Sequence, residues 1–305
     1  MDDATLATLR TAAGAVFDAG FATMVGALAS AVLLQDASSA WAAQRRRRCR
    51  RLFMLACGAT LLASLAWMEV QAIALTELSP GAALLAAGDV VVDTRFGRAW
   101  AAGALALIVG SVLSAASRYR AAPLRWLALV TTVVAISHAC AGHAGANGLG
   151  WPTLVMTLHL LAIGAWSGAV FAATTTVLRA KPDAVDGARY VTRLSTLAGA
   201  ALAGVVLTGI LSAWHGLGGS LAPLLPATAT ATTWGIVLDL KLGLVATAIA
   251  LGGFNRIAVM PTLLAMPASP APWRRFTGVL RLEAVVLLAA LVAAAMLANG
   301  EPPAA

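Results

Sequence analysis

Residues 45–75 read RRRRCRRLFMLACGATLLASLAWMEVQAIAL, and this stretch decides the fold class. Six arginines are followed directly by an apolar run. At about 1.5 Å per helical residue, the run is long enough to cross the roughly 30 Å of hydrocarbon in a bilayer. Because Lys and Arg beside a span are retained on the cytoplasmic side, the stretch predicts a transmembrane helix whose first residue faces inward.

The same pattern recurs along the whole chain. Of its 305 residues, 60% are hydrophobic and only 11% are charged, which is more apolar surface than a water-soluble core of this size can bury. Eight runs have the length of a span: residues 11–34, 52–75, 99–117, 124–142, 153–178, 195–214, 234–254 and 279–298. We therefore predict an all-α polytopic membrane protein, a single integral membrane domain over residues 1–305 built as an eight-transmembrane-helix bundle.

Positive charges gather in every second connection between these runs. The groups are Arg45, Arg46, Arg47, Arg48, Arg50 and Arg51; Arg118, Arg120 and Arg125; Arg179, Lys181, Arg189 and Arg193; and Arg256, Arg274, Arg275 and Arg281. This pattern predicts that both termini face the periplasm of a bacterial inner membrane. The net charge of +8 follows the topology instead of forming one face, so we expect the lipid bilayer as a partner and no nucleic acid.

Two short motifs indicate a tandem repeat. Thr94-Arg-Phe-Gly97 precedes the third run, and Thr232-Thr-Trp-Gly235 precedes the seventh. The chain would then consist of two parallel four-helix halves, residues 1–145 and 146–305, with a functional site where the halves meet. The alternative is chance similarity between alanine-rich helices.

The histidines fall at one predicted depth, near the outer edge of the membrane, although they belong to three separate helices. With the thioether and thiol beside them, the candidate metal ligands are His138, His143, His159, His215, Met156 and Cys140. Imidazole, thioether and thiol together suit copper, and imidazole also suits zinc, nickel and haem iron.

Each of these residues also has an ordinary explanation. A histidine at a membrane interface is commonly a hydrogen-bonded amphipathic side chain, and Cys140 can be a small core residue. His138 and His143 are five residues apart, about 140° around an ideal helix. Both can reach one ion only if their helix ends near Gly142.

Among the charged residues within the predicted spans, four share a similar depth: Asp18, Glu69, Asp239 and Lys241. A charge inside the bilayer costs at least about 2.5 kcal/mol, so such groups usually face a partner or a wet cavity. One interpretation is a buried ion pair of Lys241 with Glu69 or Asp18; the other is a path for cations or protons. Unchanged metal uptake with lowered thermal stability in Asp239→Asn would favour the ion pair.

Several motifs together resemble the copper resistance protein D family, and the resemblance spans most of the chain. They are Thr94-Arg-Phe-Gly97, Ser137-His138-Ala, Gly142-His143-Ala, His159-Leu-Leu-Ala-Ile-Gly-Ala-Trp166-Ser-Gly168, Arg193-Leu-Ser195, Leu207-Thr-Gly209, Trp234-Gly235, Leu240-Lys241-Leu242, Asn255-Arg256, Arg281-Leu-Glu283 and Pro302-Pro303. The order of the motifs is more specific than any one of them.

The resemblance implies an inner-membrane protein, not an enzyme, that moves copper from periplasm to cytoplasm, with the ion as Cu(I) or Cu(II). It also implies a periplasmic copper carrier as partner, and it assigns His138, His143 and His159 to the metal. His215 lies outside the matched motifs. Met54, Cys57 and Met260, toward the inner face, either pack as apolar residues or pass Cu(I) onward.

Two other functions stay open at this point. A membrane oxidoreductase could clamp haem b between His138 or His143 and His159, because two facing histidines can ligate haem iron axially. A copper sensor or assembly factor would bind the ion without moving it. A Soret band would identify the first, and copper uptake into proteoliposomes would exclude the second.

Overall fold

The computed structural model of the chain describes residues 3–76, 79–116, 124–145, 148–179, 182–216 and 232–300. Its helices are α1 (Asp3–Leu33), α2 (Ala40–Thr76), α3 (Pro80–Asp93), α4 (Arg95–Ala116), α5 (Leu124–Ala141), α6 (Trp151–Ile163), α7 (Ala169–Ala172), α8 (Ala184–Gly216), α10 (Thr233–Phe254), α11 (Met260–Ala265) and α12 (Pro270–Asn299). Over this part of the chain, eight helical segments are long and apolar enough to cross a membrane. The predicted all-α, multi-pass membrane fold is confirmed.

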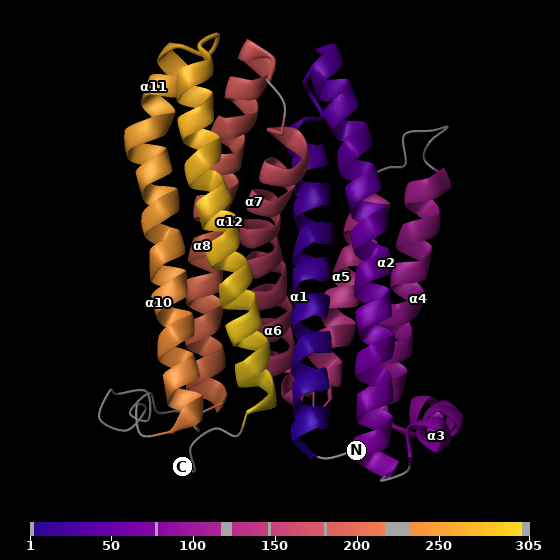
Figure 1. The fold of residues 1–305 in the computed structure, drawn as a ribbon. Helices are drawn as coiled ribbons and strands as arrows, with labels where there is room; N and C mark the ends of the chain where they lie inside the picture. The colour runs from indigo at the N-terminus through magenta and orange to yellow at the C-terminus, as the bar shows by residue number, and fades with distance from the viewer. Residues whose placement is uncertain are drawn as a thin grey trace.

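Helix α1 lies in the middle of the bundle (Figure 1). It packs against α2 on one side, and against α12 and the segment that follows α6 on the other. Helices α2, α4 and α5 stand on the side of the N-terminal half, whereas α8, α10 and α12 stand on the opposite side (Figure 1). The two ends of the described chain, at the start of α1 and the end of α12, lie at the same end of the bundle (Figure 1).

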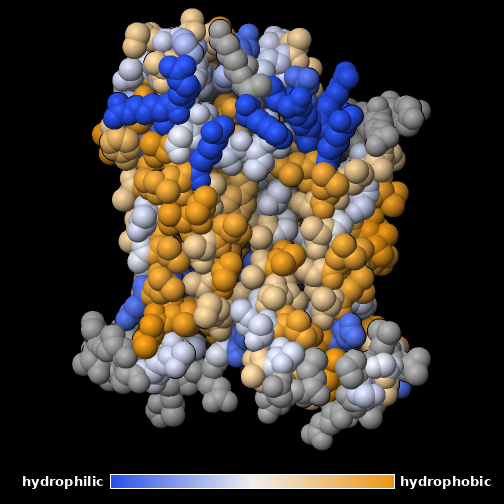
Figure 2. All heavy atoms as spheres, in the orientation of Figure 1, coloured by the Kyte–Doolittle hydropathy of each residue, from blue (hydrophilic) through white to orange (hydrophobic). Residues whose placement is uncertain are grey.

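The basic residues form a band at the other end. Figure 2 shows hydrophilic side chains gathered there, above a broad apolar belt. Exposed arginines of the basic groups include Arg47, Arg48 and Arg51 of α2, Arg125 of α5, Arg189 of α8, and Arg274, Arg275 and Arg281 of α12. The separation agrees with the charge pattern read from the sequence, although Arg118, Arg120 and Lys181 of that pattern lie outside the described residues.

The structure adds two features that the apolar runs did not predict. Helix α3 is an extra, short helix that packs against α2 and α4 at the end of the bundle opposite the basic band (Figure 1). The fifth span is not a regular α-helix, because α6 continues through a π-helical turn at Gly164–Gly168, α7 and a second π turn at Ala173–Val177. Such π turns are frequent at functional sites.

The first π turn brings the backbones of the two halves together. A Cβ atom placed on Gly168 would collide with the carbonyl oxygen of Ala22, and one placed on Gly26 would collide with the carbonyl group of Gly168. Both positions therefore require glycine. Small residues are typical of such contacts, because they let transmembrane helices approach closely where lipid supplies no hydrophobic force between them. This contact fixes α1 against α6 and α7.

The two motifs that suggested a repeat have the same local structure. The hydroxyl oxygen of Thr94 accepts a hydrogen bond from the backbone N–H of Gly97 at 2.8 Å, and that of Thr232 accepts one from Gly235 at 3.1 Å. Each threonine thus caps the N-terminus of the helix that follows, α4 or α10. The shared cap favours the repeat, while the division at residues 145 and 146 stays a prediction.

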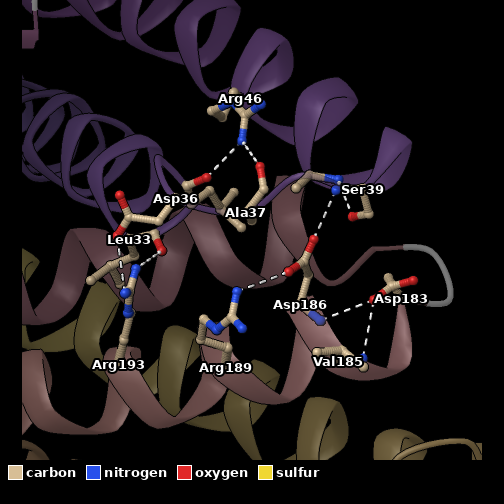
Figure 3. Close-up of polar contacts among 12 residues, drawn as sticks. Leu33, Asp36, Ala37, Ser39, Arg46, Asp183, Val185, Asp186, Arg189 and Arg193 are labelled. Atoms are coloured by element: carbon tan, nitrogen blue, oxygen red, sulfur yellow. Dashed lines mark hydrogen bonds and ion pairs between the residues drawn. The ribbon is translucent and has the colours of Figure 1, made fainter.

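A polar network joins the α1–α2 connection to the start of α8 at the basic end (Figure 3). Arg193 donates to the carbonyl oxygen of Leu33 at 3.1 Å and to Asp36 at 3.0 Å. The backbone N–H of Ser39 donates to Asp186 at 3.0 Å. We call this network, consisting of Leu33, Asp36, Ser39, Asp186 and Arg193, the inner clasp.

Candidate metal centre

His138 lies in the N-terminal half, in the last turn of α5. Its ring stacks on Phe17 of α1, with ring centroids 4.3 Å apart, and is tilted against Trp67 of α2 at 5.9 Å. The ring lines a cavity of about 20 Å³ together with Ser64 and Ser137. A cavity of that size holds about one water molecule or one small ion. The half-buried imidazole therefore faces a small, partly polar space in an apolar bundle.

Helix α5, which carries His138, ends near Gly142, as a site shared with His143 requires. Helix α5 stops at Ala141, the N–H of Gly142 bonds the carbonyl oxygen of His138 at 3.2 Å, and a 3₁₀ turn follows at His143–Gly145. The backbone condition for a joint site is thus met. The side chain of His143 lies outside what the structure describes.

His159 lies in α6, eight residues and so about 12 Å from its outer end. Its Nδ1 atom is 2.8 Å from the hydroxyl oxygen of Thr208 on α8. Gly209 leaves room for the ring, because a Cβ atom there would stand 3.4 Å from its Cε1 atom. The Leu207-Thr-Gly209 motif therefore holds His159 in place.

The hydrogen bonds around Thr208 determine which ring nitrogen of His159 carries the proton. The Thr208 hydroxyl is 2.5 Å from the carbonyl oxygen of Gly204, and that contact needs the single hydroxyl proton. Thr208 must then accept a hydrogen bond from the Nδ1–H group of His159. In the neutral ring, Nε2 then carries the lone pair, which is the tautomer that binds a metal ion through Nε2.

Asp18 and Lys241 lie within electrostatic reach of each other, from α1 and α10. The charge of Lys241 also acts on His159. Of the two partners considered for Lys241 from the sequence, Asp18 is the one whose charge acts on it. Glu69 is instead exposed, on a wide apolar groove between α1 and α2. Asp18, Lys241 and His159 thus bring three helices from the two halves together.

The remaining candidates differ in their exposure. Asp239 and His215 are exposed, the latter in the last turn of α8, whereas Met156 and Cys140 are half-buried. Within the part of the chain that the structure describes, no three His, Cys, Asp or Glu side chains are grouped to hold a metal ion. His138 packs against α1 and α2, and His159 against α8, so their described contacts do not join them in one site or in a haem clamp.

Sequence reasoning gave no role to several residues that now surround the site. Phe17, Trp67 and Thr208 contact the two histidines. Glu283 of α12 is only 3% exposed and interacts with Trp166 of the first π turn. The signal for Trp166 and Glu283 was present, because both stand in the motifs that carry the family resemblance.

Comparison with known proteins gives matches to family models only. The model described as "Copper resistance protein D-like, N-terminal domain" matches residues 1–154, and the model described as "Copper resistance protein D" matches residues 188–297. No curated protein and no solved structure matches. The first match covers the helices around His138, and the second covers Thr208, Lys241 and Glu283.

Proposed function

Because the chain belongs to the copper resistance protein D family, we propose that it is an inner-membrane transporter, not an enzyme, that moves copper from the periplasm to the cytoplasm. Copper resistance and a multi-pass membrane fold follow from the family and the eight apolar helices. The transport step, its direction and the periplasmic position of both termini are the proposed part.

The observation that carries the proposal is the hydrogen-bonded state of His159. The Thr208 hydroxyl accepts a hydrogen bond from Nδ1–H, so that Nε2 carries the lone pair, which supports a role for this imidazole as a copper ligand. A histidine with a purely structural role would be expected to use both ring nitrogens in hydrogen bonds. Neutral imidazole suits Cu(I) and Cu(II), so the oxidation state is left to measurement.

The position of the histidines supports entry from the end opposite the basic band. His138 lies within one turn of the end of α5, and His159 about two turns inside α6, both at that end of the bundle. Under the positive-inside rule this end is periplasmic. A periplasmic copper carrier would then deliver the ion at the α5–α6 connection, where His143 also stands.

The charged pair between the halves supports a controlled passage rather than an open pore. Asp18 lies within electrostatic reach of Lys241, and Lys241 lies within electrostatic reach of His159. An arriving copper cation is repelled by Lys241 and attracted by Asp18, so its arrival favours rearrangement of this pair. We infer that the interaction of Asp18 with Lys241 couples occupancy of His159 to the contact of α1 with α10.

Copper uptake into proteoliposomes tests the proposal. Vesicles with the purified protein should accumulate copper faster than protein-free vesicles, and His159→Ala should abolish most of the gain. Equal accumulation with and without protein would contradict transport and favour a sensor or assembly factor. A stoichiometric Soret band in the purified protein would favour a haem enzyme instead.

A further inference from the structure

A buried pair of sulfur atoms lies in the inner half of the N-terminal bundle. The thiol of Cys57 on α2 is 3.3 Å from the thioether sulfur of Met24 on α1, and both side chains are 0% exposed. The thiol also makes a polar contact with Ser111 of α4. Thiol and thioether are the soft ligands that select Cu(I).

A second observation concerns the same contact between α1 and α2. The hydroxyl of Thr60 lies one turn from Cys57 on α2, is buried, and has no hydrogen-bond partner among the described residues. Gly20, one turn from Met24 on α1, makes space for it, since a Cβ atom at this position would collide with the Thr60 hydroxyl. Buried hydroxyl groups are normally paired, so the Thr60 hydroxyl is available to hydrogen-bond a polar ligand that enters between α1 and α2.

The sulfur pair is aligned with the cavity of His138. Phe17 and Met24 are seven residues apart on α1, as are Ser64 and Cys57 on α2. Seven residues make two helical turns, about 10 Å, and bring the side chains back to nearly the same face. Helix α4 repeats the spacing, with Gly103 at the cavity and Gly110 beside the Cys57 sulfur. The unpaired Thr60 lies between the two levels.

We propose that Cys57 and Met24 form a Cu(I) site, two helical turns inward of His138, on a copper route through the N-terminal half. The site would take Cu(I) from the His138 cavity and pass it toward the basic end. Its place on a route rests on the proposed transport function, whereas its affinity for Cu(I) rests on the sulfur pair alone.

The chemistry of the site favours Cu(I) over Cu(II). On binding, the Cys57 thiol gives up its proton to water, and a copper–sulfur bond replaces the S–H bond. A thiolate, a neutral thioether and Cu(I) together carry no net charge, so no charge is left unpaired in the apolar interior. With Cu(II) the same site would hold one unpaired positive charge.

The helices can accommodate the ion with a small movement. With metal–sulfur bonds of about 2.3 Å, a nearly linear two-coordinate ion needs the sulfur atoms roughly 1 Å farther apart than they now lie. Met24 can supply that shift, because methionine is unbranched and has three rotatable bonds.

Cu(I) binding to the full-length protein in detergent tests the site. The chain is titrated with Cu(I) against a chromogenic Cu(I) chelator, and bound copper is examined by X-ray absorption. We expect copper–sulfur scattering in the wild type and at least a tenfold weaker retention of Cu(I) in Cys57→Ser and Met24→Leu. The matched control is Cys49→Ser, since Cys49 is an equally buried cysteine on the same helix.

Two further measurements keep the outcome decisive. If Cys57→Ser does not fold, the double variant Cys49→Ser, Cys140→Ser leaves Cys57 as the single thiol, and Cu(I) should protect it from alkylation. Absence of copper–sulfur scattering, or unprotected alkylation, would overturn the site. If the site binds Cu(I) but vesicles take up no copper, transport is wrong and the site stands. If Cys57→Ser transports and binds like the wild type, the site is wrong and transport stands.

Discussion

The threonine beside His159 has the largest consequence at the scale of single residues. Its hydroxyl both donates to Gly204 and accepts from the imidazole, so it sets the tautomer of a histidine that the sequence could only mark as a candidate ligand. The motif Leu207-Thr-Gly209 showed that these positions belong together. It could not show that they face His159, because that pairing depends on the packing of α8 against α6.

Thr208→Val removes the hydrogen bond to His159 while keeping the shape of the side chain. One lost hydrogen bond costs about 1 kcal/mol, so we expect copper uptake to fall roughly fivefold, with little change in melting temperature. The control is Thr196→Val, because Thr196 is exposed on the same helix and bonds only the carbonyl of Thr192. Equal uptake by Thr208→Val and the wild type would mean that the tautomer of His159 does not matter.

The intramembrane charges give a second prediction at this scale. Asp18→Asn leaves Lys241 without its opposite charge inside the apolar belt, so the melting temperature should fall by several degrees. Asp239→Asn should change it little, because Asp239 is exposed on the same helix as Lys241. Differential scanning calorimetry of both variants in one detergent measures the difference. A larger loss in Asp239→Asn would show that the pairing of Lys241 is wrong.

The scale of helices is where sequence reasoning succeeded most. Length and hydropathy predicted all eight spans, because a bilayer leaves few alternatives to a helix of about 20 apolar residues. They could not predict the π turn at Gly164–Gly168, since its extra residue per turn follows from contact with α1 and not from the local sequence. Helix α3 was missed for a related reason, because its 14 residues are too short to resemble a span.

Gly168→Ala tests the contact between α1 and the π turn. The added methyl group would meet the backbone of Ala22, which cannot move aside as a side chain can, so we expect a loss of at least about 2 kcal/mol in unfolding free energy. Gly243→Ala on α10 is the matched control, because nothing lies within 4 Å of its added methyl group. That variant should be as stable as the wild type or slightly more stable. Equal stability of the two variants would contradict the close approach at Gly168.

At the scale of the whole molecule, the two halves meet at three levels. The inner clasp joins them at the basic end, Gly26 and Gly168 meet within the belt, and Asp18 lies within electrostatic reach of Lys241. The sequence predicted a site between the halves from the suspected repeat alone. Which residues would form it depended on the order of helices around α1, and hydropathy does not encode that order.

The inner clasp predicts an unequal effect of its two charged partners. Arg193→Ala loses the bond to Asp36 and also the bond to the last carbonyl of α1, so the melting temperature should fall clearly. Asp36→Ala removes only an exposed ion pair, with the Asp36 side chain 59% exposed, and should cost less than about 1 kcal/mol. Thermal unfolding followed by circular dichroism compares them. If both variants lose the same stability, the carbonyl contact contributes nothing.

The most direct test of copper binding by His138 and His159 is the copper content of the purified protein, with the histidines replaced one at a time. We predict stoichiometric copper in the wild type, a marked loss in His138→Ala and His159→Ala, and little loss when the exposed His215 becomes Ala. A wild type without copper, or copper content that is unchanged in both His138→Ala and His159→Ala, would contradict a role of these histidines in copper binding.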